Sequence, residues 1–95
     1  MATYGALAHF THGEIKAAHL TYGEIKELSD ENFIKLMQVK LDRFSPKTPE
    51  QSKTKEVLQR LATDVAFALT CDALKSFAKP LLTTLWQAVL SLTQH

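Results

Sequence analysis

The chain has 95 residues, a formal net charge of +1 and an apolar share of 45%. This length is typical of one domain, and the apolar share is enough for a small hydrophobic core. The near-neutral charge excludes a global field that would attract nucleic acid or an anionic membrane, although a local patch stays possible. We therefore expect a single folded domain over residues 1–95.

Cysteine usage and the apolar stretches bear on the compartment. Cys71 is the only cysteine, so no disulfide can form within the chain. The first residues lack the basic segment and long apolar run that are typical of a secretory signal peptide. The most apolar stretch, residues 81–92, is shorter than the roughly 20 residues that a membrane-spanning helix needs. These features predict a cytoplasmic protein without a membrane segment.

A repeat dominates the N-terminal third. Residues 8–16 return as residues 18–26, with seven of the nine positions identical. In both copies a Thr is followed three residues later by Glu, as in Thr11 and Glu14, and apolar residues flank the pair. This is the pattern of a capping box with a hydrophobic staple, so it predicts two short helices. A β-hairpin is the alternative, because a period of ten keeps repeated residues on one face of a strand. Residues 1–9 are weakly patterned and are expected to be frayed or loosely docked.

A longer helix is predicted over residues 30–44. Ser29 is a good N-cap, and acidic residues follow it where the positive end of the helix dipole favours them. Pro46 ends the helix, because the residue before a proline disfavours the helical conformation. Apolar residues recur at helical spacing and predict one buried face: Phe33, Leu36, Met37, Leu41 and Phe44.

The next helix is predicted to be the longest, over residues 49–77. Thr48 is a cap, Pro49 occupies the first helical position, and Gln51 follows the cap by three residues. Residues 65–71 are apolar nearly all round, so we expect them to be enclosed on several sides. The first half is amphipathic, with a predicted inward face of Val57, Leu58, Leu61 and Val65.

Pro80 is expected to break or kink this helix, because it cannot donate to the carbonyl of Ser76. A last helix is then predicted over residues 80–93, with an inward face of Leu82, Leu85, Trp86, Val89 and Leu92. The predicted fold class is all-α. It is a small helical bundle of three strong helices, at about 30–44, 49–77 and 80–93, after short capped helical segments.

Residues that could carry chemistry are few. His9, His12 and His19 are close in sequence, but the predicted corner at Thr11 separates the first two and further ligands are missing. Cys71 lies among apolar residues, which disfavour a reactive thiolate. We therefore expect no enzyme activity, no cofactor and no metal site.

The amount of apolar surface suggests a function through protein contacts. The last two predicted helices carry more large apolar residues than a small monomer can easily cover, and twofold pairing is the commonest solution. We expect a regulator, adaptor or inhibitor that acts by protein–protein interaction and forms a homodimer. The predicted interface consists of Phe67, Cys71, Leu74, Phe77, Leu82, Leu85, Trp86 and Val89.

A local basic patch supports an alternative. Residues 43–55 surround a predicted loop and helix start and carry four basic residues against one acid. Such a corner can contact phosphates, so the alternative function is that of a nucleic-acid-associated regulator. Its predicted contacts are Lys40, Arg43, Lys47, Lys53 and Lys55.

Overall fold

The computed structural model describes residues 8–93, so the expected fraying of residues 1–9 lies mostly outside the described residues. Every regular element in this range is a helix, which confirms the all-α prediction and excludes the hairpin alternative for the repeat. The helices are α2 (His12–Ala17), α3 (Tyr22–Lys26), α4 (Asp30–Arg43), α5 (Pro49–Thr70) and α6 (Lys75–Thr93).

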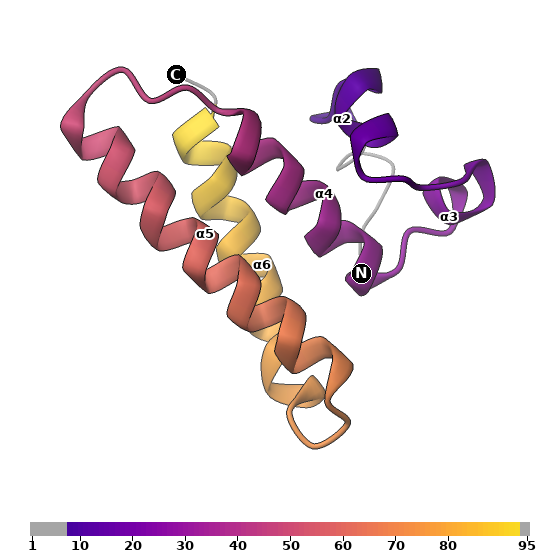
Figure 1. The fold of residues 1–95 in the computed structure, drawn as a ribbon. Helices are drawn as coiled ribbons and strands as arrows, with labels where there is room; N and C mark the ends of the chain where they lie inside the picture. The colour runs from indigo at the N-terminus through magenta and orange to yellow at the C-terminus, as the bar shows by residue number, and fades with distance from the viewer. Residues whose placement is uncertain (1–7, 94–95) are drawn as a thin grey trace.

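The three long helices lie side by side and reverse direction at each connection (Figure 1). The longest, α5, packs against both α4 and α6, and α4 also contacts α6. The short helices α2 and α3 lie beside α4, on its side away from α5 (Figure 1). Of these two, α2 packs directly against α4. The long helices therefore form the bundle, and the repeat covers one flank of it.

Both copies of the repeat form the predicted capping box. The Thr11 hydroxyl accepts from the Glu14 amide at 3.1 Å, and a Glu14 carboxylate oxygen accepts from the Thr11 amide at 2.8 Å. The corresponding distances for Thr21 and Glu24 are 3.3 Å and 2.9 Å. These bonds satisfy amides that have no partner within a helix, which is why such short segments become helical.

The corner between α5 and α6 differs from the prediction. The helix expected to continue to residue 77 ends at Thr70, and Cys71 has extended backbone angles (φ −105°, ψ 115°). The Cys71 carbonyl then accepts from the amides of Leu74 and Lys75 and starts the next helix. Turning here folds the apolar stretch back on α6 and brings Leu69 and Ala78 into one core, which a continuous rod would have kept apart.

Pro80 lies inside α6 and does not start it, so the predicted helix over 80–93 begins five residues too late. The proline deprives only the Ser76 carbonyl of a helical donor. Ser76 is exposed, so water can satisfy that carbonyl. This low cost explains why the proline does not end the helix.

The core is built from one face of each long helix. Val57 and Leu61 were expected to face inward, but they are 50% and 47% exposed. Residues 65–71 are not enclosed either: Val65 and Leu69 are buried, whereas Phe67 is 69% exposed. The buried residues of the three helices are Phe33, Ile34, Leu36, Met37, Leu41, Leu58, Ala62, Val65, Leu69, Ala78, Leu82, Leu85, Trp86, Val89 and Leu92.

An aromatic cluster ties the N-terminal segment to the bundle. The Phe10 ring stacks on Trp86 of α6 with 5.2 Å between centroids, and it meets Phe33 of α4 edge-on at 6.3 Å. Phe33 also meets Trp86 edge-on at 5.1 Å. Three mutually packed rings of this kind combine a large apolar burial with favourable ring geometry.

Candidate interaction surface

Large exposed apolar side chains gather on the hairpin of α5 and α6. Phe67 and Phe77 are the most exposed of them, at 69% and 70%. Tyr22 of α3 is the one other large apolar residue of residues 8–93 that is exposed in this way. We call the hairpin set the α5–α6 apolar surface; it consists of Val57, Leu61, Phe67, Leu74, Phe77 and Leu81.

Helical geometry explains why these residues stay outside the core. Phe67 is two residues from both Val65 and Leu69, which are buried. At about 100° per residue, two steps turn a side chain about 200° from its neighbour, so Phe67 lies opposite the buried strip. An apolar residue at this position cannot join the core without rotating α5 and exposing the buried strip.

The apolar surface lies along the junction of the two helices. Gln59 marks the α4 side of α5, since its side-chain amide donates to Asp42 of α4 at 2.8 Å. Leu61, two residues on, is therefore turned about 200° from that side and lies toward α6. On α6, Trp86 lies on the side that faces α4. Phe77 precedes it by nine residues, so at about 100° per residue its side chain points about 180° away from that of Trp86 around the helix axis. Both helices therefore carry exposed apolar residues along the outer side of the junction between α5 and α6.

The structure divides the predicted interface residues into two groups. Phe67, Leu74 and Phe77 are exposed, and Cys71 is half-buried at the corner. The other four pack inside this chain's own core and are not offered to a partner: Leu82, Leu85, Trp86 and Val89. In this chain α4 and α5 cover that face of α6, which buries these four residues inside the bundle.

Sequence reasoning missed Val57, Leu61 and Leu81. A signal for the first was present, since Val57 is adjacent to Leu58 and adjacent helical residues differ by about 100°. Both residues cannot occupy the centre of one narrow buried strip. The direction of the strip depends on the position of α4, which no local pattern specifies.

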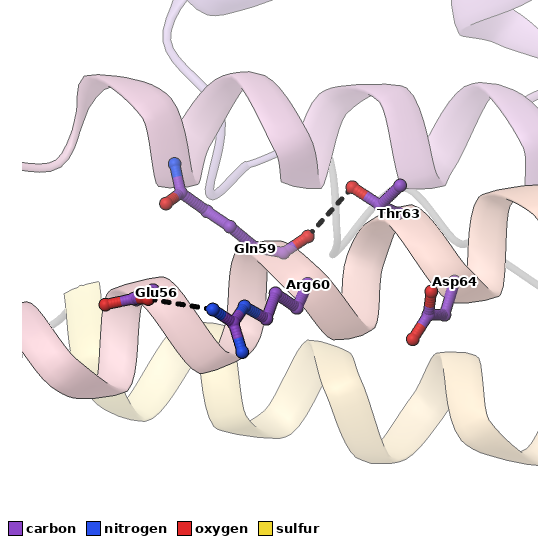
Figure 2. A pocket seen from close by; sticks show the side chains of 5 residues that line it. All are labelled: Glu56, Gln59, Arg60, Thr63 and Asp64. Atoms are coloured by element: carbon purple, nitrogen blue, oxygen red, sulfur yellow. Dashed lines mark hydrogen bonds and ion pairs between the residues drawn. The ribbon is translucent and has the colours of Figure 1, made fainter.

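The outer face of α5 carries charged side chains between the apolar ones. Figure 2 shows Glu56, Arg60 and Asp64 on successive turns of α5, with α4 on one side of the helix and α6 on the other. Arg60 Nη2 lies 3.1 Å from Glu56 Oε1, and both side chains are largely exposed. With Gln59 and Thr63 these residues surround a shallow hollow. An exposed pair of this kind contributes little to stability, so its charges stay open to a partner.

The basic corner is partly occupied by contacts within the chain. Lys55 donates to the carbonyl of Phe44 at 2.8 Å and to that of Asp42 at 3.4 Å, so it neutralises the C-terminal end of α4. The guanidinium of Arg43 lies beside Gly13, since a Cβ on that glycine would be 3.5 Å from Nη1. Lys47 and Lys53 are exposed.

Lys40, the last predicted phosphate contact, anchors the N-terminal segment. Its ammonium donates to the His9 carbonyl at 2.6 Å and lies 3.8 Å from the Glu14 carboxylate. It also lies 5.5 Å from the centroid of the Phe10 ring, in a cation–π position. Binding to nucleic acid through this corner stays a prediction, with two of its five residues committed to the chain's own acceptors.

Among residues 8–93, Glu24 is the one group whose pKa departs clearly from its ordinary value. The Thr21 amide and hydroxyl hydrogen-bond to the carboxylate and lower its pKa, with smaller contributions from Asn32 and Lys35. Such bonds favour the charged form, because an ionised carboxylate is the better acceptor. The shift belongs to a helix cap, so it does not mark a catalytic acid or base.

Two further features concern other kinds of site. Over residues 8–93, no group of three or more His, Cys, Asp and Glu side chains is close enough to hold a metal ion. The structure therefore does not bring His9, His12 and His19 together as ligands with a nearby carboxylate. No helix in the described part of the chain is long and apolar enough to cross a membrane.

No protein-family model, curated protein or solved structure matches this chain.

Proposed function

We propose that this chain acts through protein–protein contact as a small adaptor, regulator or inhibitor, and that it self-associates through the α5–α6 apolar surface. The observation that carries the proposal is the clustering of six of its seven large exposed apolar residues, among residues 8–93, on one hairpin. Monomeric proteins rarely leave such residues together in water, and grouped ones are typical of interaction sites.

Comparing the free energy of burying these side chains with the cost of association indicates that several of them act together. In a homodimer the four rings of Phe67 and Phe77, with roughly 140 Å² exposed each, contribute at most about 14 kcal/mol when they leave water, at about 25 cal/mol per Å². Association costs about 4–15 kcal/mol in lost translational and rotational freedom. The four rings alone therefore only just offset the upper end of that cost, and a stable complex needs the aliphatic members of the surface as well.

The proposal includes no catalytic step. The hollow on α5 and a second one between α4 and α5 are lined by polar side chains without histidine or cysteine. The lone cysteine supports the cytoplasm as the proposed location, because secreted domains of this size commonly depend on disulfides.

The experiment is a measurement of molecular mass by light scattering over a range of protein concentrations. We expect a concentration-dependent dimer, and we expect Phe67→Ser combined with Phe77→Ser to shift it to monomer with an unchanged circular dichroism spectrum. Tyr22→Ser is the matched control, because Tyr22 is 81% exposed on α3, outside the surface. A wild-type chain that stays strictly monomeric at high concentration would contradict self-association.

A further inference from the structure

The outward face of α5 carries a second periodic strip, distinct from the buried one. Its members follow each other at alternating intervals of four and three residues: Lys53, Val57, Arg60, Asp64, Phe67 and Cys71. This is the spacing of a coiled-coil seam, in which a straight line of side chains faces a partner helix. All are exposed except Cys71, which is half-buried at the end of the helix.

We propose that this strip pairs with the same strip of a second copy, in an antiparallel, twofold-symmetric contact centred near Ala62. The inference rests on the self-association proposed above and specifies how it occurs. A twofold axis at that level pairs each residue with the one equally far beyond Ala62. Arg60 then faces Asp64 of the second copy, and Val57 faces Phe67 of the second copy. The symmetry repeats both contacts, as any self-complementary interface does.

Charge selects this register over its neighbours. If the second copy shifts by seven residues, one repeat of the strip, in one direction, Asp64 faces Phe67 and Arg60 faces Cys71. In the other direction Val57 faces Arg60, and Phe67 faces Glu50. Each alternative places a charged group against an apolar side chain without an opposite charge, which costs desolvation energy. The proposed register matches Arg60 with Asp64 and Val57 with Phe67, and it places Lys53 against Cys71 at the two ends of the strip. Neither alternative matches both inner layers: the first pairs no opposite charges, and the second keeps only the pair of Lys53 and Asp64.

The two kinds of contact have different roles. The Val57 and Phe67 layers remove apolar area from water and supply most of the affinity. Arg60 is already held 3.1 Å from Glu56 of its own chain, so in the pair it would lie between two carboxylates. Exposed ion pairs add little affinity, but unlike charges in register suppress other alignments.

Charge reversal tests the register. Arg60→Asp alone leaves only acidic groups at this layer, and Asp64→Arg alone sets a basic group against Arg60 of the second copy with only Glu56 nearby to offset it, so each variant should weaken its own dimer about tenfold or more. An equimolar mixture of the two variants should form a heterodimer, because each then supplies the charge that the other lacks. Lys26→Asp on α3 is the matched control and should dimerise like the wild type. Loss of stability in either variant cannot explain recovery on mixing.

Cross-linking provides a second readout. Lys53→Cys should form an intermolecular disulfide with Cys71 of the second copy under mild oxidation, and Cys71→Ala should abolish it. The wild type should not cross-link, because the pairing leaves the two Cys71 residues about 27 Å apart along the helices at 1.5 Å per residue. Sedimentation and non-reducing gels measure these outcomes.

The outcomes separate the two proposals. If the wild type dimerises, both charge-reversal variants dimerise equally well and Lys53→Cys forms no disulfide, the α5 pairing is overturned while self-association stands. A wild-type monomer at all concentrations overturns both. Heterodimer recovery together with the disulfide supports both.

Discussion

The two copies of the repeat have nearly the same sequence and the same caps, but they pack differently. In the first copy Phe10 is 7% exposed within the aromatic cluster, and Glu14 is also 7% exposed, beside Lys40. In the second copy Leu20 is half-buried, and the Glu24 cap is exposed to water. Local sequence thus determines where each helix starts, whereas the neighbours in the fold determine what that start contributes.

Truncating the apolar residue before each N-cap should show the largest difference in stability between the two copies. Phe10→Ala removes a ring that stacks on Trp86 and should lower the free energy of unfolding by about 3 kcal/mol. Leu20→Ala, at the half-buried equivalent position, should cost about 1 kcal/mol. Urea denaturation followed by Trp86 fluorescence measures both. Equal losses would show that the first copy is not the better docked of the two.

The two capping glutamates, Glu14 and Glu24, should also differ in how much they contribute to the free energy of unfolding. Glu14→Gln keeps an oxygen for the Thr11 amide but removes the charge beside Lys40, and we expect a loss of about 1 kcal/mol. Glu24→Gln should have a clearly smaller effect, because water surrounds that cap. The effect of Glu14→Gln should largely vanish in a Lys40→Met background. A double-mutant cycle measures this coupling, and additive losses would contradict it.

Most of the helix starts could be predicted because their signals are local. Thr11, Thr21, Ser29 and Thr48 each cap a helix at the expected residue. The end of α5 could not be predicted in this way. Proline is a strong local signal and predicts a break or kink at Pro80, but the chain turns at Cys71, where the turn depends on packing between α5 and α6.

The candidate surface was only partly predictable, for a related reason. Sequence shows that a helix has surplus apolar residues, and three of the residues predicted for the interface, Phe67, Leu74 and Phe77, are exposed, although Phe67 was also expected to be enclosed. Which apolar face turns inward depends on the neighbouring helices, so Leu85 is buried as its helical spacing predicts, whereas Val57, also predicted to face inward, is exposed. The anchoring role of Lys40 had no sequence signal, since its acceptor, the His9 carbonyl, is 31 residues away.

The ends of the two short helices also differ. His19 follows α2 with a positive φ of 58°, and it is the one residue other than glycine with positive φ in the described chain. This left-handed conformation costs a residue with a side chain about 1 kcal/mol, so His19→Gly should stabilise the protein by somewhat less. Glu27, the cap at the end of α3, has a φ of −116°, so Glu27→Gly should destabilise it. Thermal unfolding of the pair checks the opposite signs.

The smallest expected effect concerns pH and the second cap. The Thr21 bonds lower the pKa of Glu24 below its ordinary value. A carboxyl group whose pKa is lower in the folded state than in the unfolded chain stabilises the fold above the unfolded pKa. That contribution is lost as the pH falls through the folded value. On acidification α3 should therefore lose its cap only below the usual pKa range of a glutamate.

A carboxyl titration by NMR measures the pKa of Glu24 directly, and Thr21→Ala should raise it, because the bond that favours the ionised form is weakened. A pKa that stays at the ordinary value in the wild type, or that ignores Thr21→Ala, would show that the exposed box does not persist in solution, and the two copies would then differ in their caps as well as in their packing.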